Sequence, residues 1–371
     1  YGIFLIFSGA GLLDGLLCLW LFGELIVTWN AMSYLTAIKD YRGIMLSFTA
    51  AIVITFISGW VLLMLGIPHV EALLTAVAVG YGVMLLWDVI LLHQYFPQGE
   101  KGAFLFLRWV DQFLPLAFTG LFINIGLFAH LVIMWVGPLQ VQVQGLFVGA
   151  PYHDVPALVA FLTILVTTVN FVVSVEVNFY PKYKNYYSLF NDKGAVGDIT
   201  QAGEEMLKVL NVELKYTALK QLLATALAIS LGGLLLEYVP LGFNDLMEGY
   251  FRTLCVGYGI YAVANTMLLL LLYFTDYKGA LAASGCFAGG TVLFTVISLF
   301  FPRVYYGFGF LTGSAVFFLI AAFRLDYYTK RLPYYILSVQ PVVAREKRGT
   351  FSRLGFFLSK KLERSQNSEK I

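Results

Sequence analysis

The sequence predicts an all-α fold, a polytopic transmembrane helix bundle of about ten spans, and three observations lead to that prediction. First, 59% of the 371 residues are apolar and 12% are charged, whereas a soluble domain is about half apolar and about a quarter charged. Second, several apolar runs exceed the roughly 18 residues needed to cross a bilayer. Third, positive charges gather in alternate connections between these runs, as they do in cytoplasmic loops.

The individual spans follow from breaks at glycine, proline and clusters of charge. The first segment, Tyr1 to Gly9, starts inside an apolar run without an initiator Met, so we expect sequence to be missing before it. The remaining predicted spans are Leu13–Ile38, Gly43–Leu65, Val70–Leu92, Phe113–Val136, Val155–Val177, Tyr216–Val239, Phe251–Phe274, Ala280–Phe301 and Tyr305–Phe323.

The orientation follows from the Lys and Arg residues. Of the 24 in the chain, 22 lie in alternate connections or in the C-terminal tail, and the other two are Arg252 and Arg303. Basic residues favour the cytoplasmic side in short loops and near the ends of spans. The pattern therefore predicts that the connection after the sixth span and the C-terminus are cytoplasmic in a multi-pass membrane protein.

Two cytoplasmic pieces are expected beyond the spans. Residues 1–328 are predicted to form the transmembrane bundle, and within them residues 178–215 hold an interfacial helix and then an amphipathic helix. The interfacial helix carries Tyr180, Tyr183, Tyr187 and Phe190, and the amphipathic one buries Ile199, Met206, Leu210 and Leu214. Residues 329–371 form a basic tail, in which the apolar stripe Phe351, Leu354, Leu358 and Leu362 is expected to rest on anionic lipid.

The sequence contains no constellation typical of an enzyme. Its four histidines, His69, His93, His130 and His153, are scattered without metal-ligand spacing. No glycine-rich phosphate motif stands between a strand and a helix. We therefore predict no catalytic residue, no metal site, no cofactor and no nucleic-acid partner.

Polar residues inside the spans are the most informative ones, because they are costly to bury in lipid. They are Glu24, Asp88, Asn124, His130, Asn170, Glu176 and Asn265. Such groups either hydrogen bond between helices or line a water-filled path. Asn124, His130, Asn170 and Asn265 are the candidates for lining a path. His130 and Asn124 lie six residues apart, on neighbouring sides of the fifth span.

Several short motifs, in order and at matching spacing from about Trp29 to Tyr328, carry a resemblance to a known family. They include Ala37-Ile-Lys-Asp-Tyr-Arg42, Tyr152-His-Asp-Val-Pro156, Lys193-Gly-Ala-Val-Gly-Asp-Ile199, Tyr273-Phe-Thr-Asp276 and Tyr306-Gly-Phe-Gly-Phe310. Together they resemble the Pel exopolysaccharide transporter (PelG) family. After Asn124-Ile-Gly126 the family pattern has an acidic and then a basic residue, whereas this chain has His130 and Leu131.

The resemblance implies a fold like that of the flippases of the multidrug, oligosaccharidyl-lipid and polysaccharide (MOP) exporter superfamily, with two bundles around a cavity and two N-terminal helices missing here. It also implies a function, the export of a biofilm exopolysaccharide that is an amino-sugar glycan. A cytoplasmic glycosyltransferase would make this glycan, and the exporter, the glycosyltransferase and further membrane subunits would form a synthase complex. Glu176, Tyr183 and Tyr187 are then candidates for docking that glycosyltransferase.

Three other functions remain open at this point. One is a flippase for a lipid-linked oligosaccharide, or a drug or cation antiporter, of the same superfamily; a cation exporter should bury acidic residues, and Glu24 and Asp88 come closest. Another is a membrane-embedded glycosyltransferase, for which Asp245 and Glu248 are the available acidic pair in an outer loop. The last is a scaffold subunit that transports nothing.

Overall fold

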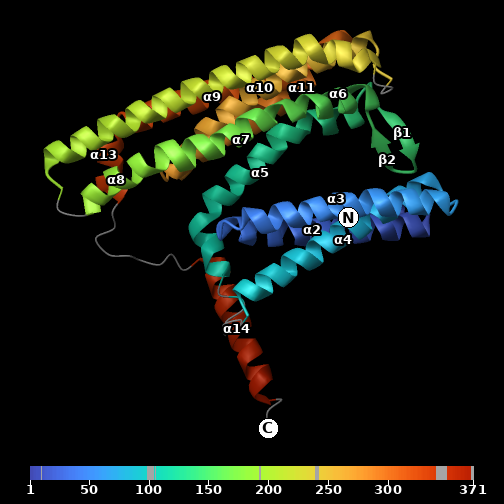
Figure 1. The fold of residues 1–371 in the computed structure, drawn as a ribbon, viewed down its shortest axis with the longest axis horizontal. Coiled ribbons are helices and arrows are strands. Elements are labelled where there is room, and N and C mark those ends of the chain that lie inside the picture. The colour runs from blue at the N-terminus through green and yellow to red at the C-terminus, as the bar shows by residue number, and fades with distance from the viewer. Residues whose placement is uncertain are drawn as a thin grey trace. The chain divides into compact units, whose positions relative to one another are not determined.

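The structure is a computed structural model that describes residues 1–9, 11–97, 104, 106–191, 194–238, 242–339 and 349–368, without the side chains of residues 144, 172, 176, 191, 233–238, 339 and 361–368. The described residues are almost all helical, with a single two-stranded sheet (Figure 1). Among them, eight helical segments are long and apolar enough to cross a membrane. The predicted all-α, multi-span fold is therefore confirmed.

The predicted spans coincide with the observed helices to within a few residues at most ends. The eight membrane-length segments cover the second to sixth and the eighth to tenth predicted spans. The first predicted segment is the six-residue helix α1 (Gly2–Phe7), and the seventh lies in α9 (Val196–Tyr238). Helix ends vary by one or two residues with the criterion used, so these agreements are as close as a sequence pattern allows.

Contacts divide the chain into two compact units, and the first comprises Tyr1–Leu105, Gln142–Val148 and Leu358–Ile371. Its spans are α2 (Leu12–Ala37), α3 (Tyr41–Met64) and α4 (His69–Tyr95), and α4 packs against both others. The hairpin of β1 (Val141–Gln144) and β2 (Phe147–Gly149) meets α1, where the Leu146 N–H donates to the Ser8 carbonyl at 2.8 Å. The hairpin was not anticipated from the sequence.

The second unit comprises Phe106–Val141 and Gly149–Phe357. Its helices are α5 (Leu107–Trp135), α6 (Pro151–Phe161), α7 (Leu165–Val173), α8 (Tyr180–Asn191), α9, α10 (Asp245–Tyr273), α11 (Tyr277–Ser298), α12 (Phe308–Thr329) and α13 (Leu332–Val339). Most of α10 is buried, because α6, α9, α11 and α12 all pack against it. The core of this unit therefore lies around α10.

Glycines let α11 and α12 approach closely. A Cβ atom added at Gly309 or Gly313 of α12 would collide with the backbone of Thr295 or Thr291 on α11. Small residues at a helix interface permit such backbone contact and are common in membrane helices. Gly309 and Gly313 thus serve the packing of α12 on α11.

The sixth span and α9 depart from simple helices in opposite ways. The sixth span is interrupted by the 3-10 turn η1 (Leu162–Ile164) and by the π-helical turn η2 (Ser174–Phe179), and then runs directly into α8. In contrast, the predicted amphipathic helix and the following span form one continuous helix of 43 residues, α9. Its predicted apolar face is confirmed, since Met206 and Leu210 are buried and Ile199 and Leu214 pack against the core.

The basic tail contains α14 (Thr350–Ser368), whose first turns belong to the second unit and whose remainder belongs to the first. Asp111 of α5 accepts hydrogen bonds from the Ser352 backbone N–H and hydroxyl, both at 2.7 Å, and so caps the start of α14. Phe351, Leu354 and Phe357 on this helix are exposed. The tail thus contains a helix that begins at a defined place on α5, and of the predicted apolar stripe the Leu362 side chain lies outside the described residues.

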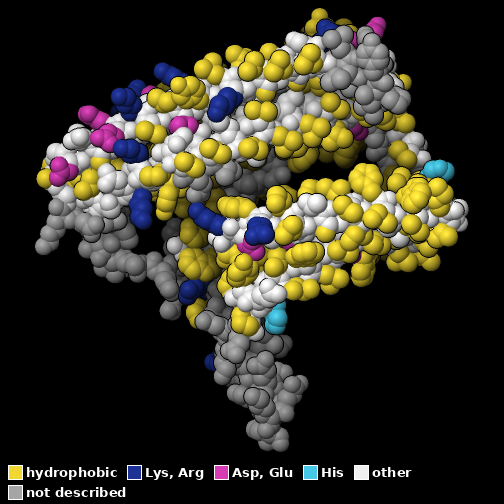
Figure 2. Space-filling view, viewed as in Figure 1, with side chains coloured by type: hydrophobic (Ala, Val, Ile, Leu, Met, Phe, Trp, Pro, Cys, Tyr) yellow, Lys and Arg dark blue, Asp and Glu magenta, His cyan; other side chains and the backbone are white. Residues whose placement is uncertain are grey.

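Large apolar side chains cover the outer faces of the helices in both units (Figure 2). Trp29 and Phe56 in the first unit and Leu222 and Phe323 in the second are examples, each more than 60% exposed. Contiguous apolar surface on this scale is unfavourable in contact with water and favourable in contact with lipid acyl chains. The chain is therefore a multi-pass membrane protein.

Candidate functional site

A cluster of buried polar and aromatic side chains lies inside the second unit, around His130 of α5. The His130 side chain is fully buried, and its Nε2 atom lies 3.3 Å from the Tyr258 hydroxyl of α10. The His153 ring of α6 and the Phe310 ring of α12 lie 5.1 Å and 4.5 Å from the His130 ring, between centroids. Four helices thus contribute to one site.

Local sequence explains why these side chains meet. His130 shares a helix face with Leu127 and Met134, which are three and four residues away and buried. His153 sits in the first turn of α6, which begins at Pro151, a residue that suits the start of a helix.

Asp154 fixes the start of α6 against the end of α5. One of its carboxylate oxygens, Oδ2, accepts hydrogen bonds from the Ala150 N–H at 2.8 Å and from the Trp135 indole N–H at 2.9 Å. This places His153 opposite His130. Two residues of the motif Tyr152-His-Asp-Val-Pro156 thus build the site, His153 as a member and Asp154 as the residue that positions it.

Three imidazole nitrogens in this cluster have no hydrogen-bond partner among the described residues: Nδ1 of His130 and both ring nitrogens of His153. Leaving a buried donor or acceptor unpaired costs about 1–3 kcal/mol. Most buried polar groups in native structures are paired. Unpaired ionisable side chains inside a membrane bundle are by default candidates for function, and this cluster is the strongest such candidate in the second unit.

A second polar cluster ties α7 to α9. The Asn170 side-chain amide donates to the Thr217 hydroxyl at 2.8 Å, and its oxygen accepts from the Lys220 ammonium at 2.5 Å. One turn before Asn170 in α7, the Thr167 hydroxyl donates to the side-chain oxygen of Gln221 in α9 at 2.6 Å. Asn170 is therefore engaged in hydrogen bonding between helices.

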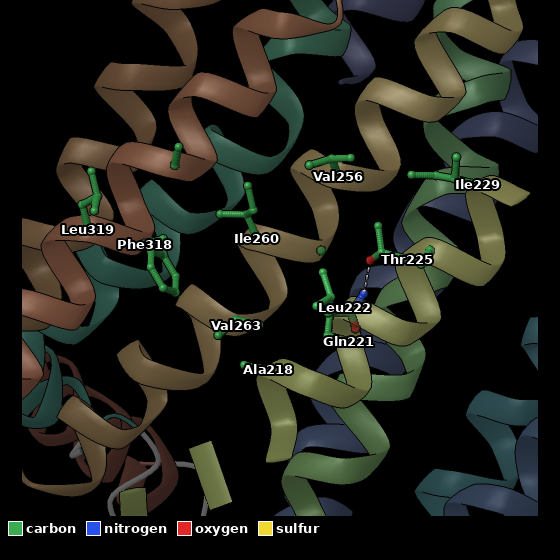
Figure 3. Close-up of a pocket in the computed structure, with 13 residues that line it drawn as sticks. Ala218, Gln221, Leu222, Thr225, Ile229, Val256, Ile260, Val263, Phe318 and Leu319 are labelled. Atoms are coloured by element: carbon green, nitrogen blue, oxygen red, sulfur yellow. Dashed lines mark hydrogen bonds between the residues drawn. The ribbon is translucent and has the colours of Figure 1, made fainter. Parts of the chain in front are cut away.

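An apolar groove of about 510 Å³ runs beside this cluster, between α9, α10 and α12 (Figure 3). Its walls include Leu222, Ile229, Val256, Ile260, Phe318 and Leu319. The polar side chains that line it, Gln221 and Thr225, hydrogen bond to each other at 3.2 Å (Figure 3). A groove of this composition offers a hydrophobic ligand contact but gives a sugar few hydrogen bonds.

The remaining path candidates lie elsewhere on the helices. Asn124 is exposed on α5, and its amide donates to the Gly120 carbonyl at 2.8 Å, so it does not join the His130 cluster. Asn265 is half-buried on α10. The structure therefore brings His130 together with His153 and Tyr258, which sequence reasoning did not single out for this site.

The docking candidates on α8 face the protein interior in part. Tyr183 and Tyr187 are half-buried, with ring centroids 4.3 Å apart, and the Tyr183 hydroxyl donates to the Tyr273 carbonyl at 3.4 Å. The Glu176 side chain lies outside the described residues, and its backbone belongs to η2.

Charged residues form the outer surface of α8 and of the adjoining part of α9. Lys182 of α8 pairs with Glu205 of α9 at 2.8 Å, and the Lys182 ammonium holds the pKa of the Glu205 carboxyl below its usual value. Lys184 is exposed nearby. A partner approaching the outer surface of α8 would therefore meet these charges before it met the tyrosine rings.

The comparison with known families identifies the chain. The sequence model of the PelG family, described as "Putative exopolysaccharide Exporter (EPS-E)", matches residues 1–337. The chain belongs to the PelG family. No curated protein and no solved structure matches it.

Membership confirms the resemblance read from the short motifs, and the matched residues 1–337 include most of both units. The PelG description is that of an exporter, so the substrate class is an exopolysaccharide and the function is transport. The His130 cluster, the α7–α9 cluster and α8 all lie within the matched residues. No group of three or more metal-ligating side chains occurs in the part of the chain that the structure describes.

Proposed function

We propose that this PelG-family protein exports a nascent Pel-like amino-sugar glycan across a bacterial inner membrane, in concert with a cytoplasmic glycosyltransferase that polymerises it. The family match over residues 1–337 carries this proposal. The membrane-length helices support it, because a polymer made in the cytoplasm needs a protein that spans the bilayer in order to leave.

The deciding experiment is deletion of the gene in its native host, followed by complementation. Loss of secreted glycan, with glycosyltransferase activity retained in isolated membranes, is the expected result. Return of secretion on complementation identifies the exporter. Unchanged secretion after deletion would refute the proposal, and loss of glycosyltransferase activity as well would favour a scaffold.

The proposed orientation places α8, the first part of α9 and the tail in the cytoplasm, and it rests on the segregation of 22 of the 24 basic residues. Asn185 of α8 and Val304 between α11 and α12 are both exposed and suit cysteine labelling, once Cys18, Cys255 and Cys286 are replaced by Ala. An impermeant thiol reagent should label Val304→Cys but not Asn185→Cys in intact spheroplasts. The reverse pattern would invert the orientation.

Asn124 is the path candidate with the most direct test. Its exposed amide can donate to and accept from sugar hydroxyls, whereas Asn170 and His130 are engaged inside the second unit. In the proposed path, Asn124 and Asn265 contact the glycan. His130 and Asn170 do not contact it but hold together the helices that form the path. Asn124→Ala should reduce secretion without reducing inserted protein. Asn170→Ala should instead reduce protein abundance, because it unpairs Thr217 and Lys220.

We also propose that α8, with η2 and Glu176 before it, docks the glycosyltransferase. The internal contacts of Tyr183 and Tyr187 mean that Ala at these positions would disturb packing as well as docking. Charge reversal of Lys182 and Lys184 together is therefore the cleaner test. Glu205→Gln, which breaks the Lys182–Glu205 pair without reversing a charge on α8, is the matched control. Co-purification of the glycosyltransferase should fall with the charge reversal only. Retained co-purification in the charge-reversed protein would move the docking surface elsewhere.

The tail helix α14 is proposed to rest on anionic lipid. Its exposed Phe351, Leu354 and Phe357 can enter the headgroup region while Arg353 and Lys360 meet lipid phosphates. A peptide of residues 349–371 should bind vesicles containing phosphatidylglycerol and leave pure phosphatidylcholine vesicles unbound. Equal binding to both would argue against the electrostatic part of the proposal.

A further inference from the structure

We propose that His130 and His153 form a site that binds one proton inside the second unit, and that loading and release of this proton accompany export. The inference rests on the proposed exporter function. It adds a ligand, the proton, and a residue, His153, to the site that His130 occupies.

The geometry suits a shared proton. The two rings are fully buried, come from α5 and α6, and lie 5.1 Å apart between centroids at an interplanar angle of 65°. A protonated imidazole has two N–H donors and a neutral one offers one acceptor nitrogen. Protonated His130 can donate from Nε2 to the Tyr258 hydroxyl, 3.3 Å away. The neighbouring His153 ring has two nitrogens without a hydrogen-bond partner among the described residues, and either can take the proton instead.

The surroundings limit the site to one proton. From α6 the ionisable neighbours are His153 and Asp154, and from α10 they are Tyr258 and Tyr250, whereas α12 contributes the uncharged ring of Phe310. The Tyr250 hydroxyl donates to the Arg303 carbonyl and so stays a neutral donor.

The nearby carboxylate does not change that count. Oδ2 of Asp154 accepts hydrogen bonds from Trp135 and the Ala150 N–H, and the buried Oδ1 has no hydrogen-bond partner among the described residues, so neither oxygen bonds to an imidazole ring. Two imidazolium ions at this separation in a membrane interior would repel strongly, so the pair should titrate as one coupled unit.

Access to the proton requires a change of conformation. Both rings are fully buried, so neither exchanges a proton with water while α5, α6, α10 and α12 stay packed as they are. Proton binding is therefore linked to any movement of these helices that opens the cluster. Such linkage is what a transporter needs if the proton is to bias one conformation over another.

The small number of histidines makes a direct test practical. The chain has four, of which His69 and His93 are exposed at the two ends of α4 and serve as internal controls. Nuclear magnetic resonance of 15N-histidine-labelled protein in nanodiscs, between pH 4 and 8, follows the protonation of the His130 and His153 rings. His130 and His153 should take up one proton, and not two, between them within this titration.

Substitutions test whether His130 and His153 share one proton or titrate independently. His153→Gln should move the titration midpoint of His130 by at least about one pH unit, the size expected for interacting sites. Tyr258→Phe, which keeps the ring and its packing, should move it in the same experiment. Signals of His130 and His153 that stay neutral throughout, or a His130 midpoint unmoved by His153→Gln, would overturn the proton site.

Secretion tests whether the proton matters for export. His130→Gln and His153→Gln preserve hydrogen bonding but cannot carry the charge, so each should lower secreted glycan about tenfold at normal protein abundance, a change of about 1.4 kcal/mol in barrier. His69→Gln and His93→Gln should secrete normally. Normal secretion by both buried variants would refute coupling even if the pair titrates. A gene deletion that leaves secretion unchanged would refute the exporter function and leave the titration result standing.

Discussion

Two turns, one in each unit, share a local sequence and a local structure. Asp40-Tyr-Arg-Gly43 joins α2 to α3, and Asp276-Tyr-Lys-Gly279 joins α10 to α11. In both, the residue before the aspartate, Lys39 or Thr275, has a φ of 63°. In both, the carboxylate accepts a hydrogen bond from the glycine N–H, at 3.0 Å and 3.1 Å, and so caps the following helix.

The glycine is required at the same place in each turn for the same reason. A Cβ atom at Gly43 or Gly279 would collide with the carboxylate of Asp40 or Asp276 that lies over it. In this geometry the carboxylate occupies the space of a Cβ atom, so glycine fits without displacing it. Local sequence therefore accounts for the whole geometry of both turns.

The partners of the two aspartates differ. Asp276 is 5% exposed and receives two hydrogen bonds from the Arg324 guanidinium of α12, at 2.6 Å and 2.9 Å. Asp40 is half-buried and receives one from the Tyr95 hydroxyl at the end of α4, at 3.1 Å. The comparison teaches that the same turn becomes a buried ion pair or a solvated hydrogen bond according to the third helix that packs on it.

The largest effect is expected from Arg324→Ala. It leaves the buried Asp276 carboxylate without its ion pair, and loss of one partner of a buried pair costs 3–5 kcal/mol. We expect about 3 kcal/mol, the lower end of that range, because the guanidinium is 28% exposed. The free energy of unfolding in SDS, followed by tryptophan fluorescence, measures it. Lys330→Ala, which breaks an exposed pair with Asp326, is the matched control and should cost about 0.5 kcal/mol or less.

A second difference should appear between Gly279→Ala and Gly43→Ala. Overpacking of a tight site costs about 1–3 kcal/mol. Gly279→Ala should lie in that range, because its Cβ would press on both Asp276 and Arg324, which hold each other in place. Gly43→Ala should cost less, since the half-buried Asp40 can move. Thermal unfolding of the two variants side by side tests the order, and a reversed order would contradict the comparison.

Removal of the cap in the more exposed turn should have a moderate effect. Asp40→Ala loses the hydrogen bond to the Gly43 N–H, and loss of a helix cap costs about 1 kcal/mol. Asp40→Asn should recover most of that stability, because an amide oxygen can still cap the helix. An equal loss in both variants would mean that the charge of Asp40, and not its cap, stabilises the turn.

The smallest effect is expected from Tyr95→Phe, which removes one hydrogen bond to a half-buried carboxylate. The loss should be the smallest of the series, because water can replace the exposed Tyr95 hydroxyl as a donor to Asp40. In the Asp40→Ala background the same substitution should change nothing further, because the acceptor is already gone. A loss of the same size in that background would show that the Tyr95 hydroxyl stabilises the protein through another contact.

Much of the fold could be read from local pattern. Apolar runs located the spans, and the face of Met206 and Leu210 on α9 was predicted from helical spacing. The hairpin after α5 was missed, since Val141–Gln144 and Phe147–Gly149 are too short to give a pattern. The sequence did not predict that the amphipathic helix and the seventh span form one continuous helix, α9, because no residue between them favours either a break or continuity.

The candidate site was predictable only in part. The cost of burying a polar group in a membrane pointed to His130 and Asn170. It could not reveal that His130 would meet His153, which stands 23 residues later at the start of another helix. Nor could spacing reveal that Tyr183 and Tyr187 turn partly toward the end of α10.

By itself the sequence determined the membrane spans, the family and the shape of the two aspartate turns, because each depends on residues within a few positions of one another. Tertiary structure alone decided that Arg324 pairs with Asp276, that Tyr95 pairs with Asp40, and that His130 lies against His153 and Tyr258. These pairs join residues 23 to 128 positions apart. Contacts at that separation depend on which helices pack together, and packing is selected by the shape and burial of whole helix faces.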